Sequence, residues 1–290
     1  MDARVDISLE DRIAEAYSNL SAKLKDAADY VVAHQMDVAT RSLRAVSAES
    51  GVSPASLSRL ARTLGFDSYE AMRELCRRTL AGRNVSLSER AAMLKDTGDG
   101  VPHILDRQAQ ACVDNITDMA ARLDRARLQQ AVHALQTARQ VVLFGAFGST
   151  GITEYLVYLA NYFSSHWTLA GRMGSSLGAA LTNTGEEDVL FIVTKSPYAR
   201  RAVHAAEIAK SAGTQTIIIT DSHTCPALKY ADFAFIVPTE TPQFLSSYVA
   251  TLTLIETMIA MLVAQSEGDA SQRIRDVENQ NKRLGEFWDD

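Results

Sequence analysis

Hydrophobic and polar positions follow two different periods along the chain. Up to about residue 139, apolar residues recur every three or four positions, which is the period of amphipathic helices. From Gln140 onward, short continuous apolar runs alternate with helical stretches. Such runs are typical of strands that are buried on both faces of a sheet. The pattern therefore predicts an all-α part followed by an α/β part.

Five apolar runs predict five strands of the α/β part. Strands that alternate with helices form a parallel sheet covered by helices, so we expect an α/β sandwich of the flavodoxin-like or Rossmann-like type. The predicted strands are VVLFG (141–145), HWTLAG (166–171), DVLFIVT (188–194), TQTIIIT (214–220) and DFAFIV (232–237). The predicted helices are Thr150–Phe163, Ser175–Leu181, Arg200–Ala212, Ala227–Ala231 and a final long helix, Leu245–Gln265.

A helix-turn-helix pattern lies within Ser42–Phe66. Two amphipathic runs are joined there by the three-residue turn Gly51-Val52-Ser53. Gly51 favours the positive φ that reverses the chain, and Ser53 before Pro54 is typical of a helix start. The inward apolar positions are Val46, Val52, Leu57 and Leu60. Two helices packed at a steep angle are therefore expected.

The outward face of the second helix is polar and basic. Short side chains beside arginines are suited to base edges and phosphates in a major groove. Two-helix corners also occur in all-α domains that bind no DNA, so the prediction depends on the turn, the cap and the arginines together. The residues expected to contact double-stranded operator DNA are Ser42, Arg44, Ser53, Ala55, Ser56, Ser58, Arg59 and Arg62.

Charge is unevenly distributed. The chain of 290 residues has a net charge of −6. Val38–Leu80 holds seven arginines and four acidic residues, a net charge of +3, which leaves −9 for the remainder. This balance excludes a protein that coats nucleic acid over its whole surface. A small basic module on an acidic body instead favours a site-specific DNA-binding protein.

Further helices complete the predicted domain organisation. Ile7–Leu20 and Ser21–His34 supply apolar faces, and the spacing of Asp67 and Glu70 predicts a capping box that opens a helix to about Leu80. Glycine, serine and asparagine near residues 81–100 indicate a linker, followed by helices over 102–123 and 125–139. The expected divisions are a helix-turn-helix domain over 1–81, a linker over 82–101, an α/β domain with leading helices over 102–268, and a C-terminal helix or tail over 269–290.

Several other protein classes find no support in the sequence. The three cysteines have no disulfide or zinc spacing, and no metal or cofactor is expected. The N-terminal residues lack the apolar core of a signal peptide. The longest apolar run, Val249–Val263, is too short and too polar to cross a bilayer. We therefore expect a cytoplasmic protein without a membrane partner.

Two strand ends carry hydroxyl groups on short turns. Gly145–Gly151, GAFGSTG, follows the first predicted strand, and Thr194–Pro197, TKSP, follows the third. In open parallel sheets, ligands lie beyond the carboxyl ends of the strands. Backbone N–H groups at the start of the following helix favour an anion, and Lys195 adds charge. A phosphate pocket is therefore predicted.

The same glycines allow two other interpretations. Gly145, Gly148 and Gly151 are spaced three and three apart, whereas dinucleotide-binding turns have glycines two and then three apart. The second predicted strand also lacks the acidic residue that would bind a ribose, so a nicotinamide cofactor is disfavoured. The alternative that these glycines serve only close strand–helix packing remains open.

The motifs resemble those of a known family. Val52–Phe66, VSPASLSRLARTLGF, is similar to the helix-turn-helix marker of the RpiR family of bacterial transcriptional regulators. The C-terminal part resembles a SIS (sugar isomerase) domain, which binds phosphosugars, and the two resemblances together cover about residues 7–265. They imply a regulator of sugar or carbon metabolism, controlled by a phosphorylated sugar or related metabolite and assembled as a homodimer or homotetramer. The implied effector-binding residues are Gly148, Ser149, Thr194, Lys195 and Ser196.

Three residues depart from the family pattern. Phe147 stands where the family usually has glycine, Pro197 replaces a glycine, and Ala199 replaces a hydroxyl-bearing residue. A different effector, or a SIS domain that serves only for assembly, would account for these departures. A fused sugar-phosphate isomerase is a further alternative. It is disfavoured because His166, His204 and His223 show no catalytic spacing, and we expect no enzyme activity.

Overall fold

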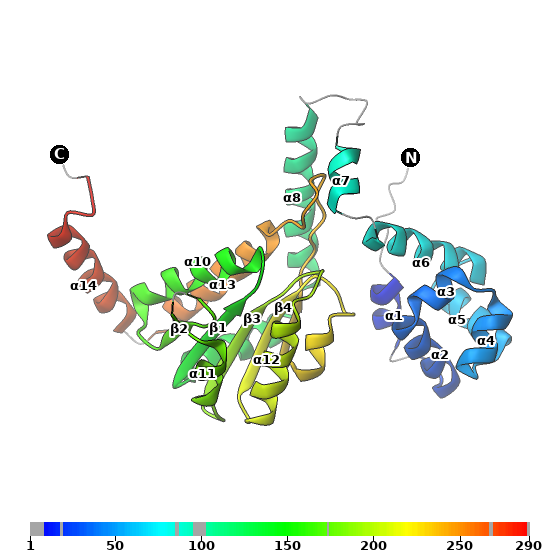
Figure 1. Ribbon diagram of the computed structural model, residues 1–290, viewed down its shortest axis with the longest axis horizontal. Coiled ribbons are helices and arrows are strands. Elements are labelled where there is room, and N and C mark those ends of the chain that lie inside the picture. Colours follow the sequence, from blue (N-terminus) through cyan, green and yellow to red (C-terminus); the bar gives the residue numbers. More distant parts are fainter. Residues whose placement is uncertain are drawn as a thin grey trace. The chain divides into compact units, whose positions relative to one another are not determined.

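The computed structural model describes residues 9–17, 20–84, 87–94, 103–172, 174–266 and 269–288. The chain divides into two compact units, Met1–Met93 and Leu94–Asp290. Figure 1 shows the first unit as helices only and the second as a sheet with helices on both faces. The predicted fold class is confirmed.

The described part of the first unit consists of helices. The predicted turn joins α4 to α5. Helix α3, which the sequence pattern did not predict, precedes α4. Leu57 and Leu60 on α5 and Val46 on α4 are fully buried, while Val52 in the turn is partly buried. The helices are α1 (Leu9–Tyr17), α2 (Ala22–Ala33), α3 (Gln35–Thr40), α4 (Leu43–Ser50), α5 (Pro54–Thr63), α6 (Tyr69–Asn84) and α7 (Leu87–Met93).

The helix-turn-helix turn has the local geometry that its sequence predicts. Gly51 has a φ of 69°, in the left-handed region that glycine adopts readily. The Ser53 hydroxyl accepts a hydrogen bond from the Ser56 N–H at 3.1 Å, and Pro54 opens α5. The capping box before α6 is a correction, because Ser68 rather than Asp67 accepts the hydrogen bond from the Ala71 N–H.

The second unit contains a five-stranded parallel sheet of strand order β2-β1-β3-β4-β5. The strands are β1 (Gln140–Gly145), β2 (Trp167–Leu169), β3 (Asp188–Val193), β4 (Gln215–Thr220) and β5 (Phe233–Ile236). The α-helices are α8 (His103–Arg122), α9 (Arg125–Thr137), α10 (Ser149–Phe163), α11 (Leu177–Thr182), α12 (Arg200–Ser211), α13 (Val249–Gln265) and α14 (Asp269–Leu284).

Alternate residues of the central strands enter two hydrophobic cores. Val141 and Phe191 belong to the core that also contains residues of α8, α9, α10 and α13. Val142 and Ile192 point to the opposite face and pack with α11 and α12. Both faces are therefore covered, which explains why these strands read as continuous apolar runs.

Three elements differ in detail from the prediction. The segment predicted as a helix over 227–231 is a 3-10 helix, Pro226–Tyr230. Helix α13 begins at Val249 rather than at Leu245, so residues 245–248 form an irregular approach to it. The predicted linker includes the end of α6 and all of α7, and its residues 85, 86 and 95–101 lie outside the described residues.

No single helix among the described residues is long and apolar enough to cross a membrane. Within the same residues, one pair of helices, α13 and α14, reaches that length and composition together, but the pair is bent by 110°.

The close approach of α10 to β1 generates a stability prediction. A methyl group on Gly145 would lie 2.4 Å from the carbonyl oxygen of Ser149, whereas one on Gly151 meets no atom within 4 Å. We expect Gly145→Ala to lower the free energy of unfolding by about 1–3 kcal/mol. The control Gly151→Ala should leave it equal or slightly higher, because alanine favours a helix. Urea unfolding of both variants checks this, and equal stabilities would show that α10 moves away from β1 without cost.

Candidate functional site

The exposed face of α5 carries two arginines. Ala55, Arg59 and Arg62 are exposed on α5, and Arg44 is exposed on α4. Among the described residues, no hydrogen bond or ion pair engages the guanidinium groups of these three arginines. The positive charges of these arginines are therefore available to a polyanion. They belong to the residues that the sequence predicts to contact DNA.

Other arginines of the first unit have structural partners. Arg41 forms ion pairs with Asp37 at 3.2 Å and with Glu49 at 2.6 Å. Arg73 pairs with Glu70 at 2.9 Å and donates to the Ala39 carbonyl. Arg41 and Arg73 therefore have partners within the domain, unlike Arg44, Arg59 and Arg62 among the described residues.

The serines predicted to contact DNA have roles inside the domain. Ser42 caps α4 by accepting a hydrogen bond from the Ala45 N–H at 3.3 Å. Ser53 caps α5, and its hydroxyl also lies 2.9 Å from that of Ser56. Ser58 is half-buried. DNA contact by Ser42, Ser53, Ser56 and Ser58 stays a prediction, and at Ser42 and Ser53 it would coexist with capping.

In the second unit, the turn after β1 places Ser149 at the first position of α10. Ser149 is 1% exposed, and its hydroxyl lies 2.9 Å from the hydroxyl of Tyr248. Tyr248 also lies against Gly148, where an added methyl group would come within 3.2 Å of the phenol oxygen. The backbone of this turn and the Tyr248 ring are therefore in close contact.

The turn after β3 meets the same tyrosine. Lys195 is 6% exposed, and its ammonium nitrogen lies 4.6 Å from the centre of the Tyr248 ring. The ammonium donates a hydrogen bond to the Ser247 carbonyl at 3.1 Å. Ser149 and Lys195, which are 46 positions apart in the sequence, thus converge on Tyr248.

Thr194 and Ser196 flank this lysine in different environments. Thr194 is 3% exposed, whereas Ser196 is exposed. The Ser196 N–H donates to the carboxylate of Asp221 at 3.0 Å. An anion that approached this amide would have to replace the carboxylate.

Burial dominates the acid–base behaviour of Lys195. Removal from water lowers its pKa to about 7, although the charge of Asp221 acts in the opposite direction. Burial also raises the pKa of Tyr248, while the hydrogen bond with Ser149 lowers it. The lysine therefore exchanges its proton near neutral pH, and an incoming anion would favour the charged form.

Sequence reasoning missed two participants. Asp221 directly follows β4 at the same edge of the sheet, so the rule that identified the other two turns also applies to it. Tyr248 carries no comparable signal, since only folding brings the segment before α13 to the edge. Ser247 is buried, whereas Glu256 is exposed and accepts a hydrogen bond from Tyr155.

The three departures from the family pattern have distinct environments. Phe147 has a φ of 53°, a left-handed conformation that favours glycine, and its ring is 76% exposed. A cis peptide bond joins Ser196 to Pro197. Ala199 is buried at the N-cap of α12.

The histidines considered for catalysis lie in three separate places. His166 precedes β2, at the amino-terminal edge of the sheet, whereas Ser149 and Lys195 follow carboxyl ends. His204 is exposed on α12, and His223 is exposed after β4.

Two known domains match the chain in the order of its two units. The helix-turn-helix domain of the rpiR family matches residues 7–81, and the SIS domain matches residues 134–261. These matches define a helix-turn-helix protein with a SIS domain. The chain belongs to the RpiR family of transcriptional regulators, which confirms the resemblance seen in the sequence.

Similar proteins match either both parts of the chain or its SIS domain alone. An uncharacterized HTH-type transcriptional regulator of Haemophilus influenzae is 25% identical over 280 residues, covering 90% of this chain and 92% of that protein. The sugar isomerase domain of an RpiR transcription factor from Sphaerobacter thermophilus has 21% identity and a TM-score of 0.58, covering 61% of this chain and 99% of that one. The Vibrio vulnificus NanR protein complexed with ManNAc-6P has 20% identity and a TM-score of 0.57, covering 96% and 99%. These structures share the fold.

The buried lysine predicts a rise of stability with pH. The pKa of Lys195 is about 7 when folded, below its ordinary 10.5, so the unfolded chain binds more protons between these values. The contribution of Lys195 to the free energy of unfolding should therefore increase from pH 7 to pH 9, by up to about 1.4 kcal/mol per pH unit. Urea unfolding at pH 6, 7, 8 and 9 measures it.

The matched variants are Lys195→Met and Lys229→Met, since Lys229 is exposed. Lys195→Met should flatten the rise between pH 7 and pH 9, and Lys229→Met should keep it. An identical pH dependence in Lys195→Met and the unmodified protein would contradict the assignment.

Proposed function

We propose that this regulator responds to a small phosphorylated sugar or related metabolite bound at the carboxyl ends of β1 and β3. The observation that carries the proposal is the convergence of Ser149 and Lys195 on Tyr248. A hydroxyl, an ammonium group and the start of a helix lie together there. Each of these groups interacts favourably with a phosphate.

The proposed phosphate site includes Gly148, Ser149, Thr194, Lys195 and Ser196. A phosphate would compete with Tyr248 for the Ser149 hydroxyl and with Asp221 for the Ser196 amide. Its charge would keep Lys195 protonated and so offset part of the cost of burying that lysine. Ligand binding at this edge would therefore be coupled to rearrangement of the segment before α13.

The proposed output is a change in affinity for an operator. Arg59 and Arg62, together with Arg44 and Ala55, form the proposed DNA-binding surface, with Ser42, Ser53, Ser56 and Ser58 beside them. Two recognition helices are needed for two half-sites, so a homodimer or homotetramer acting on DNA in the cytoplasm is proposed. A ligand that favours one arrangement changes DNA affinity by its differential binding free energy, typically about 1–3 kcal/mol.

We propose a sensing role for the SIS domain in place of catalysis. Isomerisation of a sugar phosphate needs a base near the sugar carbonyl. The histidine that is partly buried, His166, lies at the opposite edge of the sheet from Ser149 and Lys195. Turnover of a sugar phosphate by the purified protein would favour the enzyme alternative.

The DNA-binding proposal predicts different effects for two arginines. Arg59→Ala should weaken binding to the preferred sequence by about 1–3 kcal/mol and relax its specificity at one position. Arg62→Ala should weaken binding to all sequences similarly and reduce the salt slope by about one. Fluorescence anisotropy with DNA selected from a random pool measures both. The control is Lys23→Ala, which removes an exposed charge from α2. Equal DNA affinities of the unmodified protein and the three variants would refute the proposed surface.

The effector proposal predicts a ligand-dependent gain in thermal stability. In a thermal-shift screen against sugar phosphates, sugar acids and nucleotides, a phosphosugar should raise the melting temperature. Ser149→Ala with Lys195→Met should remove most of that rise, because it removes a hydroxyl and an ammonium group from the site. Ser211→Ala, on the exposed end of α12, should retain it. A rise that persists in the double variant would place the ligand elsewhere.

A further inference from the structure

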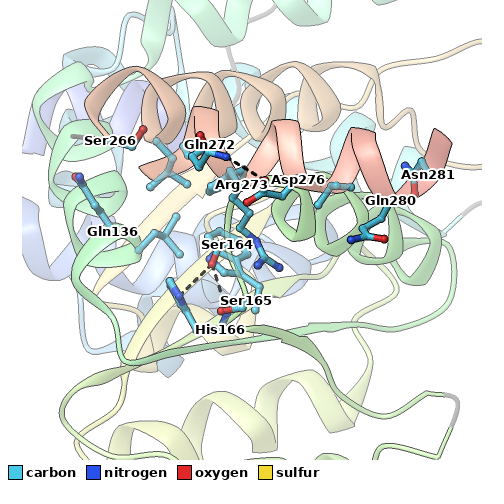
Figure 2. Close-up of a pocket in the computed structure, with 16 residues that line it drawn as sticks. Gln136, Ser164, Ser165, His166, Ser266, Gln272, Arg273, Asp276, Gln280 and Asn281 are labelled. Atoms are coloured by element: carbon cyan, nitrogen blue, oxygen red, sulfur yellow. Dashed lines mark hydrogen bonds between the residues drawn. The ribbon is translucent and has the colours of Figure 1, made fainter. Parts of the chain in front are cut away.

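A cavity of about 830 Å³ lies beside α14, and none of the residues of the proposed effector site lines it. Figure 2 shows α14 on one side and Ser164, Ser165 and His166, which precede β2, on the other. Its volume lies within the range of small-molecule sites, roughly 300–1,000 Å³. Because β2 is parallel to β1, this is the amino-terminal edge of the sheet, whereas Ser149 follows a carboxyl end.

Two residues that line this cavity carry a buried side-chain nitrogen that makes no well-formed hydrogen bond with the described residues. These nitrogens are Nε2 of His166 and Nε of Arg273. A buried donor without an acceptor is destabilising, and an acceptor atom supplied by a ligand would remove that cost. Figure 2 shows Arg273 extending from α14 toward the segment that contains Ser164.

The ring of His166 has a hydroxyl group beside one of its two nitrogens. The Ser164 hydroxyl lies 3.0 Å from Nδ1 and accepts a hydrogen bond from the His166 N–H at 3.4 Å. When this hydroxyl donates to Nδ1, the ring proton lies on Nε2. Burial lowers the pKa of His166, although a hydrogen bond with the Leu135 backbone acts in the opposite direction, so the ring is neutral at pH 7. In this tautomer His166 presents an N–H donor, as Arg273 does.

The rest of the lining suits a polar molecule with an apolar part. Asp276, the acidic residue among the lining residues, accepts a hydrogen bond from Gln272 at 3.0 Å. Phe163 and Trp167 supply aromatic surface. The remaining polar side chains of the lining are those of Gln136, Ser164, Ser165, Ser266, Gln280 and Asn281.

We propose that this cavity is a second binding site, for a small molecule that carries a carboxylate or phosphate. The oxyanion would accept hydrogen bonds from His166 and Arg273, and the apolar part would lie against Trp167. Such a ligand would bridge α14 to the start of β2. The site would thus connect a second metabolite to the position of the C-terminal helix.

Tryptophan fluorescence provides a local test. The chain contains two tryptophans, Trp167 and Trp288, and Trp288 is 93% exposed. In the full-length Trp288→Phe protein, emission reports on Trp167 alone. Titration with citrate or with inorganic phosphate at millimolar concentration should change this emission saturably. A response to one of the two anions identifies whether a carboxylate or a phosphate is preferred.

Matched variants in the Trp288→Phe background localise the response. Arg273→Gln and His166→Gln should each weaken binding about tenfold or more, because each removes a donor to an anion. Lys282→Gln removes a charge from α14 outside the cavity, and Ser149→Ala alters the proposed effector site, so both should retain the response. No emission change with either anion, or an equal response in Arg273→Gln, would overturn the proposal. Emission that changes with protein concentration but not with anions would also overturn it, in favour of a subunit contact.

Discussion

The parallel pairing of β1 with β3 is the constraint on which the proposed effector site depends. Gly145 pairs in register with Val193, so both strands end at one level of the sheet. The turns that follow are therefore delivered to the same edge. Gly145 permits the contact that positions α10, because any larger side chain would collide with the Ser149 backbone. Strand register and one close approach together place Ser149 and Lys195 beside a common partner.

Tyr248 completes a cluster of polar groups that bond to one another. Its hydroxyl bonds to Ser149, its ring faces the Lys195 ammonium group, and the neighbouring Ser247 carbonyl accepts from that lysine. An anion would exchange these contacts for its own, so the net binding energy depends on the difference between two sets of contacts. Phosphate recognition and movement of the segment before α13 are therefore parts of the same proposed event.

In the first unit, the side chains that stabilise the fold are largely distinct from the arginines of the proposed DNA-binding surface. Ser42 and Ser53 start the two helices through backbone hydrogen bonds, and Arg41 and Arg73 are held in ion pairs. Arg59 and Arg62 extend from a helix whose opposite face is buried. A rigid helix that presents uncommitted cations is suited to a groove lined by phosphates.

Local pattern determined most of the fold and much of the proposed site. The runs at 141–145 and 188–194 predicted strands because both faces of each are buried, and Gly51 and Ser53 predicted a turn because their preferences are local. The carboxyl-end rule then predicted a phosphate pocket at the two turns that contain Ser149 and Lys195, and the family resemblance implied Ser149 as a ligand. Tertiary structure decided that Tyr248 joins them, that α13 begins at Val249, and that His166 meets Arg273 across a cavity. These features join segments distant in the chain, and no local periodicity or turn chemistry encodes which side chains meet when those segments pack.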